Sequence, residues 1–345
     1  MAVSTRESLP IYQQLFDHYK DQILRSHLHP GQRIDSIAEI QRRHGVARET
    51  AKRVLSLLAE EGFIVQFRGK GSFVADLGPK KKVWGLVFPF FSIQYEDLIL
   101  KITSHATALG RELHPFCDHN DYSEEIRLVG NMLNERYEAV LVIPTMDESK
   151  TWDFYARLSP QAPPVVLLDH TMTCNDFPFV IQSYDMGVTQ AISYLTDRKR
   201  GGVAFIENEA WSGRNMVLDL MRWTYVDLMS ARRPGYEPVV LPSASQVNVM
   251  DLRKSGITGI FCCDDASAIR TIGRIKEQGG EVPRDFNVVS YGNTDLSRFF
   301  SPAISSVDPK NFEMAAVLAG LLQPEGRLPS NTRHVTRPEL VVRET

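Results

Sequence analysis

The sequence predicts an α/β protein in which a small helical domain with a β-hairpin precedes a larger domain of two lobes built on parallel sheets. Two observations lead to this prediction. Between residues 31 and 74, two amphipathic segments separated by a short turn are followed by a Gly-rich, basic hairpin pattern. Beyond residue 82, short apolar runs alternate with amphipathic segments, which is typical of parallel strands covered by helices on both faces.

The first pair of elements reads as two helices joined by a tight turn. Ile37, Ile40 and Gln41 recur at three- and four-residue spacing, and Gly45 is suited to end this helix because glycine readily adopts a positive φ. After a short turn, Glu49 opens a second helix. Its apolar face is expected to carry Val54, Leu55, Leu58 and Ala59.

The opposite face of the second helix is polar and cationic, which suits the major groove of DNA.

After Gly62 the chain alternates, with Phe63, Val65 and Phe67 facing one way, and then reverses through a Gly-rich turn. Glycine lets the backbone approach a partner closely, and cations neutralise phosphates. The predicted DNA-binding residues are Arg48, Thr50, Lys52 and Arg53 in the helix and Arg68, Gly69, Lys70, Gly71 and Ser72 in the hairpin.

Across 10–74 the chain resembles a GntR-type winged helix, a family that shows a similar turn and helix and an RxGxGTFV-like wing. One departure is Ile34-Asp35-Ser36, where the family usually has Leu-Pro-Ser. Asp35 or Ser36 is still able to cap the first reading helix, and Glu39 is placed to complete a capping box. The alternative is a small helical domain whose charges are simply solvated.

The charge of the chain is divided unequally along its length. The net charge is −3, yet residues 1–82 hold 14 Lys and Arg residues against nine Asp and Glu residues, whereas the remainder holds 25 against 33. Only the N-terminal part is therefore suited to polyanions. No signal-peptide pattern follows Met1 and no apolar run approaches the roughly 20 residues of a membrane-spanning helix, so we expect a soluble, cytoplasmic protein without a membrane partner.

The four cysteines, Cys117, Cys174, Cys262 and Cys263, lack metal-ligand spacing, and the adjacent pair is not placed for an ordinary disulfide. We therefore expect reduced packing residues. The histidines are scattered without a second ligand at helical spacing, so neither a structural metal nor a cofactor is expected.

A short Gly/Pro/Lys stretch from Asp76 to Lys82 separates the hairpin from the next apolar strand. We place a DNA-binding domain at 1–76, a linker at 77–82 and a two-lobed effector-binding and dimerisation domain at 83–345. The linker lysines either lie near the DNA backbone or are ordinary solvated residues.

The larger domain shows two successive series of strand and helix patterns. Two such series in tandem imply two lobes with a ligand between the ends of their strands. Strands are expected at 83–89, 112–116, 139–143, 165–168, 202–206, 238–241, 259–263 and 287–291, and helices at 97–109, 123–135, 152–158, 185–196, 217–230 and 267–278.

These segments resemble the effector domain of LacI-type repressors, which is similar to periplasmic sugar-binding proteins. A GntR-type winged helix joined to a LacI-type sensor is the build of arabinose repressors and related sugar-utilisation regulators. The strings that carry the resemblance occur in the family's order and span nearly all of the larger domain, at 85–89, 165–170, 202–206, 260–265, 282–291 and 339–343.

The resemblance places an effector between the lobes and points to Arg214 and Asp264. An Arg fork and a carboxylate both bind vicinal hydroxyls through directional, charge-assisted hydrogen bonds, which suits a sugar. Alternatively, Arg214 pairs with Asp219 or Glu209 on the surface, and Asp264 only caps the helix after it. Further effector candidates, each with a structural or solvated role as the alternative, are Tyr95, Glu96, Asp118 and Trp211.

Two departures from the family bear on the effector pocket. After the strand ending at Tyr291 the family usually supplies an Asp that holds a sugar hydroxyl, whereas this chain has Gly292-Asn293-Thr294-Asp295. Asn293 is the expected partial substitute. The family's Asp-Asn ahead of Gly187 is replaced by Ser183-Tyr184. These replacements predict a diverged pocket.

The sequence therefore predicts a ligand-responsive regulator that binds a palindromic operator as a homodimer and leaves the DNA when a small sugar-like effector closes the lobes. Repression of a carbohydrate-utilisation operon is the expected mode, and a non-sugar metabolite or an activating role is the alternative. One rival class is an enzyme with a DNA-binding appendage, but no Gly-rich phosphate loop or nucleophile elbow is present in the sequence. The other is a transport-type binding protein, which the complete winged helix and the missing secretion signal disfavour.

Overall fold

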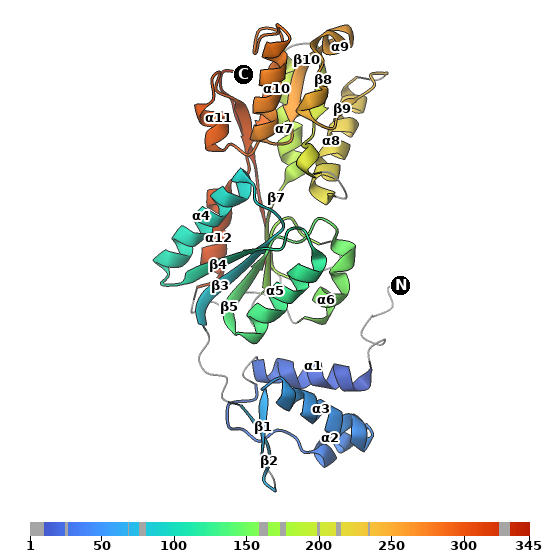
Figure 1. Cartoon of the computed structure of the whole chain (residues 1–345), viewed down its shortest axis with the longest axis vertical. Coiled ribbons are helices and arrows are strands. Elements are labelled where there is room, and N and C mark those ends of the chain that lie inside the picture. The colour runs from blue at the N-terminus through green and yellow to red at the C-terminus, as the bar shows by residue number, and fades with distance from the viewer. Residues whose placement is uncertain are drawn as a thin grey trace.

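The computed structural model divides the chain into a small N-terminal domain and a larger domain of two lobes, which follow one another along the long axis of the molecule (Figure 1). The predicted fold class is confirmed, because each lobe is built on a six-stranded, mainly parallel sheet. The structure describes residues 10–24, 27–67, 69–75, 81–158, 165–172, 177–198, 201–211, 215–233, 235–323 and 332–345.

The small domain packs three helices against a β-hairpin. Its elements are α1 (Ile11–Leu24), α2 (Ile37–His44), α3 (Arg48–Glu60), β1 (Ile64–Phe67) and β2 (Gly71–Val74). The core takes apolar side chains from each helix and from one face of the hairpin. In Figure 1, α1 lies on the side of the lobes, whereas α2, α3 and the hairpin lie on the far side.

The ends of the first reading helix are set by the predicted signals. The Ser36 hydroxyl accepts a hydrogen bond from the Glu39 amide at 3.3 Å, and the Glu39 carboxylate accepts one from the Ser36 amide at 2.7 Å. This reciprocal pair is the predicted capping box. Gly45 has a φ of 65° and donates its amide to Gln41, which ends α2 as expected. The second helix, α3, begins at Arg48, one residue before its predicted start.

The expected alternation of the hairpin is wrong in one respect. Phe63 is buried but precedes the strand, and the strand directs Ile64 into the core instead. Val65 and Phe67, which share the other face, are 46% and 52% exposed. The physical reason is the positive φ of Gly62, which turns the chain just before the strand and removes Phe63 from its alternation.

The first lobe contains a fully parallel sheet in the order β13-β7-β6-β5-β3-β4. The helices α4 and α12 cover one face and α5 and α6 the other. The strands are β3 (Lys81–Phe88), β4 (Glu112–Cys117), β5 (Tyr137–Val142), β6 (Val165–Asp169), β7 (Phe179–Gln182) and β13 (Arg333–Thr336), and the helices are α4 (Ile93–Ala108), α5 (Tyr122–Asn134), η2 (Glu148–Lys150), α6 (Trp152–Arg157) and α12 (Asn311–Leu321).

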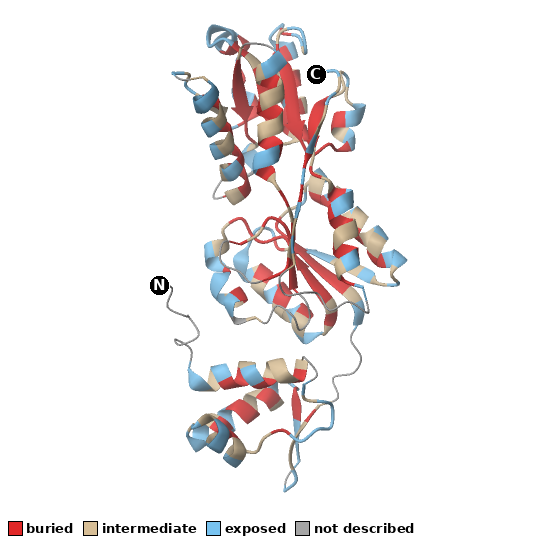
Figure 2. Cartoon of the chain, turned by 180° about the vertical axis from the view of Figure 1, so that it is seen from behind, coloured by how far each residue is buried: buried red, intermediate tan, exposed pale blue. Residues whose placement is uncertain are grey.

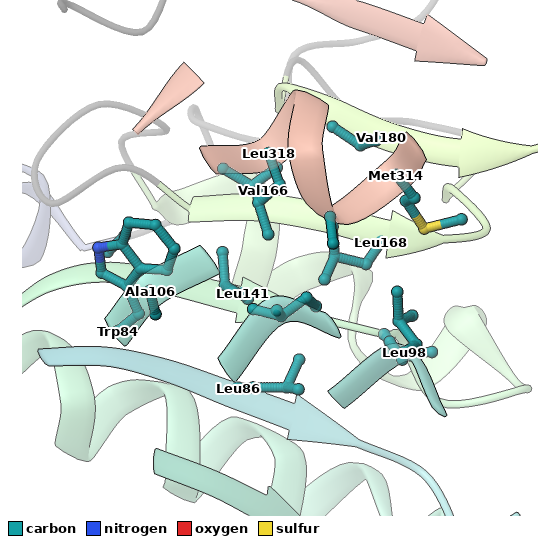
Figure 3. Packing of buried hydrophobic residues seen from close by; sticks show 14 of the residues in the cluster. Trp84, Leu86, Leu98, Ala106, Leu141, Val166, Leu168, Val180, Met314 and Leu318 are labelled. Atoms are coloured by element: carbon teal, nitrogen blue, oxygen red, sulfur yellow. The ribbon is translucent and has the colours of Figure 1, made fainter. Parts of the chain in front are cut away.

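The core of the first lobe shows why both faces of its sheet need a cover. Consecutive residues of β3, Leu86 and Val87, belong to different apolar clusters on opposite faces of the sheet. Figure 3 shows the cluster beneath α4 and α12, where Leu141 of β5 and Val166 of β6 face Leu318 of α12. Strands buried on both faces read as continuous apolar runs, which is why the sequence located them well.

The second lobe repeats the parallel arrangement in the order β14-β12-β11-β10-β8-β9, with β14 antiparallel at one edge. The helices α7 and α8 cover one face, and α9 and α10 cover the other. Its strands are β8 (Gly202–Ile206), β9 (Val239–Leu241), β10 (Ile257–Cys262), β11 (Asn287–Tyr291), β12 (Ser305–Asp308) and β14 (Glu339–Val341), and its helices are α7 (Tyr184–Arg198), η3 (Glu209–Trp211), α8 (Met216–Arg232), η4 (Ala244–Gln246), α9 (Val249–Lys254), α10 (Asp265–Glu277) and α11 (Asp295–Phe299).

The two lobes are not simply consecutive in the sequence, as two series in tandem would imply. The chain passes from the first lobe to the second after β7, returns after β12 to place α12 and β13 in the first lobe, and passes back into β14. The elements β7, α9, α11, β12, α12 and β13 were not expected from the sequence. Short strands and the almost uniformly apolar α12 carry too little periodicity to be assigned locally.

The boundary of the larger domain also differs from the prediction. Strand β3 begins at Lys81, so Lys81 and Lys82 belong to the first lobe rather than to the linker. The Lys81 ammonium pairs with Glu135 at 2.5 Å and lies 5.2 Å from the centroid of the Tyr137 ring. Residues 76–80 lie outside the described part of the chain.

Cys117, Cys262 and Cys263 are free thiols, as expected, and Cys174 lies outside the described residues. Within the part of the chain that the structure describes, no helix has both the length and the apolar character needed to cross a membrane.

Leu318→Ala is expected to lower the free energy of unfolding by about 2–5 kcal/mol, because it empties a fully buried site of the first lobe. The matched control is Glu313→Ala on the exposed side of the same helix, with an expected change below about 0.5 kcal/mol. Urea denaturation followed by circular dichroism measures both. Equal effects of the two substitutions would contradict the packing of α12 in this core.

Candidate functional site

The predicted reading face of α3 is open to solvent. Arg48, Lys52 and Arg53 are exposed and Thr50 is half-buried, whereas Ala51 and Val54 on the other side are fully buried. The residues that hold α3 in the domain are therefore distinct from those that remain free to meet a partner. This arrangement fits a helix that enters a DNA groove.

The cations of α3 are only loosely paired within the protein. Lys52 lies 3.9 Å from Glu49, and Arg53 lies 3.9 Å from Glu60. All these side chains are more than half exposed, and exposed ion pairs contribute little free energy. A phosphate group is therefore able to replace either carboxylate at small cost.

A partly buried contact joins α2 to α1 and involves Asp35, the residue that stands where the family usually has a proline. Asp35 accepts a hydrogen bond from the Tyr19 hydroxyl at 2.6 Å and pairs with Arg43 of α2. Burial, together with the Asp35 carboxylate, raises the pKa of Tyr19, so the phenol remains a donor. Asp35 thus orients the first reading helix by side-chain contacts, in place of the backbone rigidity of a proline.

The hairpin needs glycine at two positions of its turn. Gly69 and Gly71 have φ values of 79° and 105°, a region in which other side chains are strained. A Cβ atom on Gly71 would lie 3.3 Å from Nε of Arg33, whose backbone pairs with Phe73. Lys70 is exposed between these glycines and Ser72 is half-buried, whereas Arg68 lies outside the described residues.

A small pocket lies between the two lobes, next to the segment that connects them. Its walls contain three aromatic rings and three uncharged polar side chains. Phe90 packs against the apolar cores of both lobes, which places the pocket at their junction. The lining residues are Phe90, Ser92, Gln94, Tyr95 and Met146 from the first lobe and Tyr184, Asn215 and Val217 from the second.

The carboxylate of Asp169, at the end of β6, anchors two of the pocket walls. The Tyr95 hydroxyl donates to it at 3.1 Å, and the Tyr184 hydroxyl lies 2.9 Å from both of its oxygens. Gln182 and His170 add further polar contacts. Burial and the neighbouring Asp169 charge raise the pKa values of Tyr95 and Tyr184 well above the ordinary value. Both phenols therefore stay protonated and donate to the carboxylate.

The same network reaches the sheet of the second lobe. The Tyr291 hydroxyl, at the end of β11, donates to Gln182 at 2.7 Å, and its ring stacks on Tyr184 with centroids 5.4 Å apart. Gly187 of α7 leaves room for this ring, because a Cβ atom there would lie 2.6 Å from Tyr291. Residues of both lobes, including Gln182 at the end of β7, thus form one hydrogen-bonded network around Asp169.

Asp118 forms a second polar site at the end of β4. It is fully buried, and its Oδ2 atom has no hydrogen-bond partner among the described residues. Burial, and then the nearby Glu125 carboxylate, raise the pKa of Asp118 from 3.8 to about 8. Glu125 is itself held by the Tyr155 hydroxyl and the Thr145 amide. At neutral pH Asp118 therefore carries a proton.

The predicted effector residues do not gather in one place. Of those that the structure describes, Tyr95 alone lines the pocket. Glu96 is exposed on the outer side of α4. Asp264 caps α10 through the Ser267 amide, which was its alternative role, and also accepts a hydrogen bond from Asn208.

Asn293 is a structural bridge in the second lobe. Its amide contacts Asp308 at 3.1 Å and Arg343, and its backbone nitrogen donates to Ser306. Arg214 and the side chain of Trp211 lie outside the described part of the chain. Asp219, one of the alternative partners for Arg214, pairs with Arg222 at 2.9 Å.

Apart from Tyr95, the residues that shape the pocket were not predicted from the sequence. Asp169 gave a signal, because it is a carboxylate at the carboxyl end of a continuous apolar strand, where ligands of parallel sheets bind. Tyr184 gave a weaker sequence signal, because Ser183-Tyr184 replaces the Asp-Asn that the family usually has there. Gln182 and Phe90 gave none, because their roles depend on contacts between distant segments.

A DNA-reading domain joined to a two-lobed domain with a pocket at its hinge defines the class of ligand-responsive, DNA-binding regulators. The comparisons with known proteins agree. Residues 11–74 match the model of the bacterial regulatory proteins of the gntR family, and residues 212–345 match the periplasmic binding protein-like domain. Both predicted resemblances are confirmed.

Two relatives cover most of the chain. The HTH-type transcriptional repressor PurR of Pasteurella multocida is 34% identical over 317 residues, covering 87% of this chain and 90% of that protein. The arabinose metabolism transcriptional repressor of Geobacillus stearothermophilus is 21% identical over 362 residues, covering 98% of each. The chain belongs to the HTH-type transcriptional repressors.

Solved structures share the fold of the larger domain. The transcription regulator CcpA of Lactococcus lactis superimposes with a TM-score of 0.62 at 19% identity, over 77% of this chain and 99% of that chain. A LacI-family regulatory protein of Chloroflexus aggregans superimposes with a TM-score of 0.64 at 18% identity, over 76% and 98%.

Tyr184→Phe is expected to lower the free energy of unfolding by about 1–2 kcal/mol, because the buried Asp169 carboxylate loses a donor. The matched control is Tyr194→Phe in the same helix, since the Tyr194 hydroxyl is buried without a partner in the described structure. Its removal is expected to be neutral or stabilising. Thermal unfolding measures both, and a control as damaging as Tyr184→Phe would contradict the role given to Asp169.

The stability of the protein is expected to fall with rising pH through the titration of Asp118. The raised pKa means that the folded state keeps a proton which the unfolded state releases above about pH 4, so this stabilisation is lost between about pH 4 and 8. Asp118→Asn cannot titrate there. Between pH 5 and 8 we expect its stability to rise relative to the parent by at least about 1.4 kcal/mol, the equivalent of one pKa unit.

Urea denaturation at a series of pH values measures this difference. The exposed Glu96→Gln is the control and should run parallel to the parent. Parallel curves for Asp118→Asn and the parent would show that Asp118 titrates normally.

Proposed function

We propose that this repressor controls a carbohydrate-utilisation operon, binds a palindromic operator as a homodimer and releases it when a small sugar-like effector occupies the pocket between the lobes. The observation that carries the proposal is the position of this pocket, which is lined from both lobes beside their connecting segment. A ligand held by both lobes favours one arrangement of them, and such differential affinity is what a switch requires.

The lining of the pocket supports a sugar-like effector, and because its free volume is only about 10 Å³ in this structure, the lobes must move apart to admit one. The rings of Phe90, Tyr95 and Tyr184 offer flat faces for the C–H surface of a sugar, and Ser92, Gln94 and Asn215 offer hydroxyl and amide groups for its polar edge. Relatives from two organisms are named as repressors of arabinose metabolism, which favours this class of ligand. We retain Arg214 and Trp211 as effector-binding residues, because they closely precede Asn215 in the chain.

The small domain supplies the DNA contacts. Arg48, Thr50, Lys52 and Arg53 read base edges or hold adjacent phosphates from α3, and Arg68, Lys70 and Ser72 contact the backbone from the hairpin. Base-edge contacts give sequence specificity, whereas the hairpin cations mainly add salt-dependent affinity. The positive balance of the N-terminal segment supports this division of roles.

A homodimer through the first lobe would present two reading helices to major grooves about 34 Å apart. Its support is an apolar surface on α4 and the adjoining edge strand β4, where Leu100 and Phe116 are exposed. Exposed apolar side chains beside a free strand edge favour association between copies. A two-fold dimer of this kind matches the symmetry of a palindromic operator.

The coupling between effector and operator need not be large. A change of 10- to 100-fold in operator affinity corresponds to a coupling free energy of about 1–3 kcal/mol. This is comparable with the net contribution of one or two buried hydrogen bonds, each about 1 kcal/mol. The hydrogen bonds around Asp169 are the natural element to be rearranged, because they join both lobes at the pocket.

Fluorescence anisotropy with a labelled duplex from upstream of the protein's own gene tests the proposal, over a series of salt concentrations and with pentoses, hexoses and sugar acids. A tight complex is expected, released by one of these compounds. Arg48→Ala is expected to weaken it by about 10- to 100-fold, the equivalent of one lost base contact. The control Lys276→Ala, at an exposed position of α10 in the second lobe, should leave affinity unchanged.

Arg214→Ala separates the two activities. It should keep operator affinity and lose the response to the effector. A complex indifferent to every compound would contradict the sugar assignment, and the absence of binding to any duplex would contradict the assigned DNA contacts.

A further inference from the structure

The hairpin of the small domain carries an apolar surface that the fold of that domain does not use. Val65 lies directly opposite Phe73 and Phe67 directly opposite Gly71, so these positions share one face of the hairpin. The rings of Phe67 and Phe73 meet edge to face, with centroids 5.7 Å apart. We call Val65, Phe67 and Phe73 the wing strip.

Two residues of the wing strip are exposed and Phe73 is half-buried, whereas the opposite face of the hairpin is buried at its base. Ile64 and Val74, on the inner face, belong to the core of the small domain. Val65 is 46% exposed and Phe67 52% exposed. Leaving a large aromatic ring in water forgoes the stabilisation that its burial provides, so this exposure favours a role outside folding.

The position of the hairpin indicates which partner the strip meets. Its tip points away from the two lobes, on the same side of the small domain as α2 and α3 (Figure 1). The reverse view in Figure 2 shows the same hairpin projecting with exposed residues near its tip. A duplex that is read by α3 would therefore lie beside the hairpin.

Cations flank the wing strip. Arg33 pairs with Phe73 from the other side of β2, and its Nε would lie only 3.3 Å from a Cβ atom on Gly71, the residue opposite Phe67. The Arg33 side chain therefore reaches the strand position that lies opposite Phe67, and its contact with Glu39 is a partly exposed one at 3.6 Å. Lys70 is exposed at the turn. Apolar side chains on a hairpin that also carries these cations suit a partner with phosphates around an apolar surface, which is the surface of a nucleic-acid groove.

We propose that Phe67, supported by Phe73, is a DNA-contacting residue that packs on deoxyribose and base edges between the phosphates held by Arg33 and Lys70. This proposal rests on the DNA contacts assigned above and adds an apolar contribution to them. Its thermodynamic signature differs from that of the cations. Burial of an apolar ring releases no condensed counterions, whereas each neutralised phosphate steepens the salt dependence of binding by about 0.9.

The test uses the full-length chain and the labelled duplex from upstream of its own gene, with anisotropy measured over a series of salt concentrations. Phe67→Ala is expected to weaken binding by about 5- to 30-fold, as for partial loss of an aromatic contact, and to leave the salt dependence unchanged. Phe67→Leu should retain affinity within about threefold, because it keeps an apolar side chain. Lys70→Ala should reduce the slope of log affinity against log salt by about 0.9.

Circular dichroism verifies that the variants remain folded, as expected for an exposed position. The control is Val65→Ala, farther from the tip on the same face, with a smaller expected loss of affinity than Phe67→Ala. Binding by Phe67→Ala as tight as that of the parent would overturn the inference and leave the proposed function intact. Failure of the parent chain to bind any duplex would overturn the proposed function and the inference with it.

Discussion

The buried carboxylate of Asp169 is the constraint on which the architecture of the sensor depends. A carboxylate removed from water is tolerated only when donors surround it, and here they come from the first lobe through Tyr95 and from the second through Tyr184. Because these two rings also line the pocket, the geometry of the pocket depends on the same hydrogen bonds that join the lobes. An effector that changes the pocket therefore changes the relation between the lobes.

The path of the chain makes this relation adjustable. Three connecting segments join the lobes, after β7, after β12 and after β13, and each lobe has its own apolar core. Rotation about these segments would change the contacts at the junction, among them those of Phe90 and the hydrogen bond between Gln182 and Tyr291, while most of each core moved as a unit. Hinge motion of this kind is a known means of switching in two-lobed domains.

The sequence predicted what depends on local pattern. The strands at 202–206 and 287–291 were located to the residue, because a fully buried parallel strand is a continuous apolar run. The exposed cations of α3 and the cap at Ser36 followed from helical periodicity and capping rules. The Asp169 network could not be predicted in this way, since Tyr95 is 74 residues from Asp169 and Tyr291 is 109 from Gln182. The helix α12 was not predicted because its almost uniformly apolar sequence lacks helical periodicity.

Calorimetric titration of the effector into the protein, with and without saturating operator DNA, tests the central claim most directly. If occupation of the pocket and operator binding are coupled, the effector binds more weakly to the complex, by the same factor by which it weakens DNA binding. Equal effector affinities for the free protein and the complex would contradict the claim that the pocket between the lobes controls the DNA-reading domain.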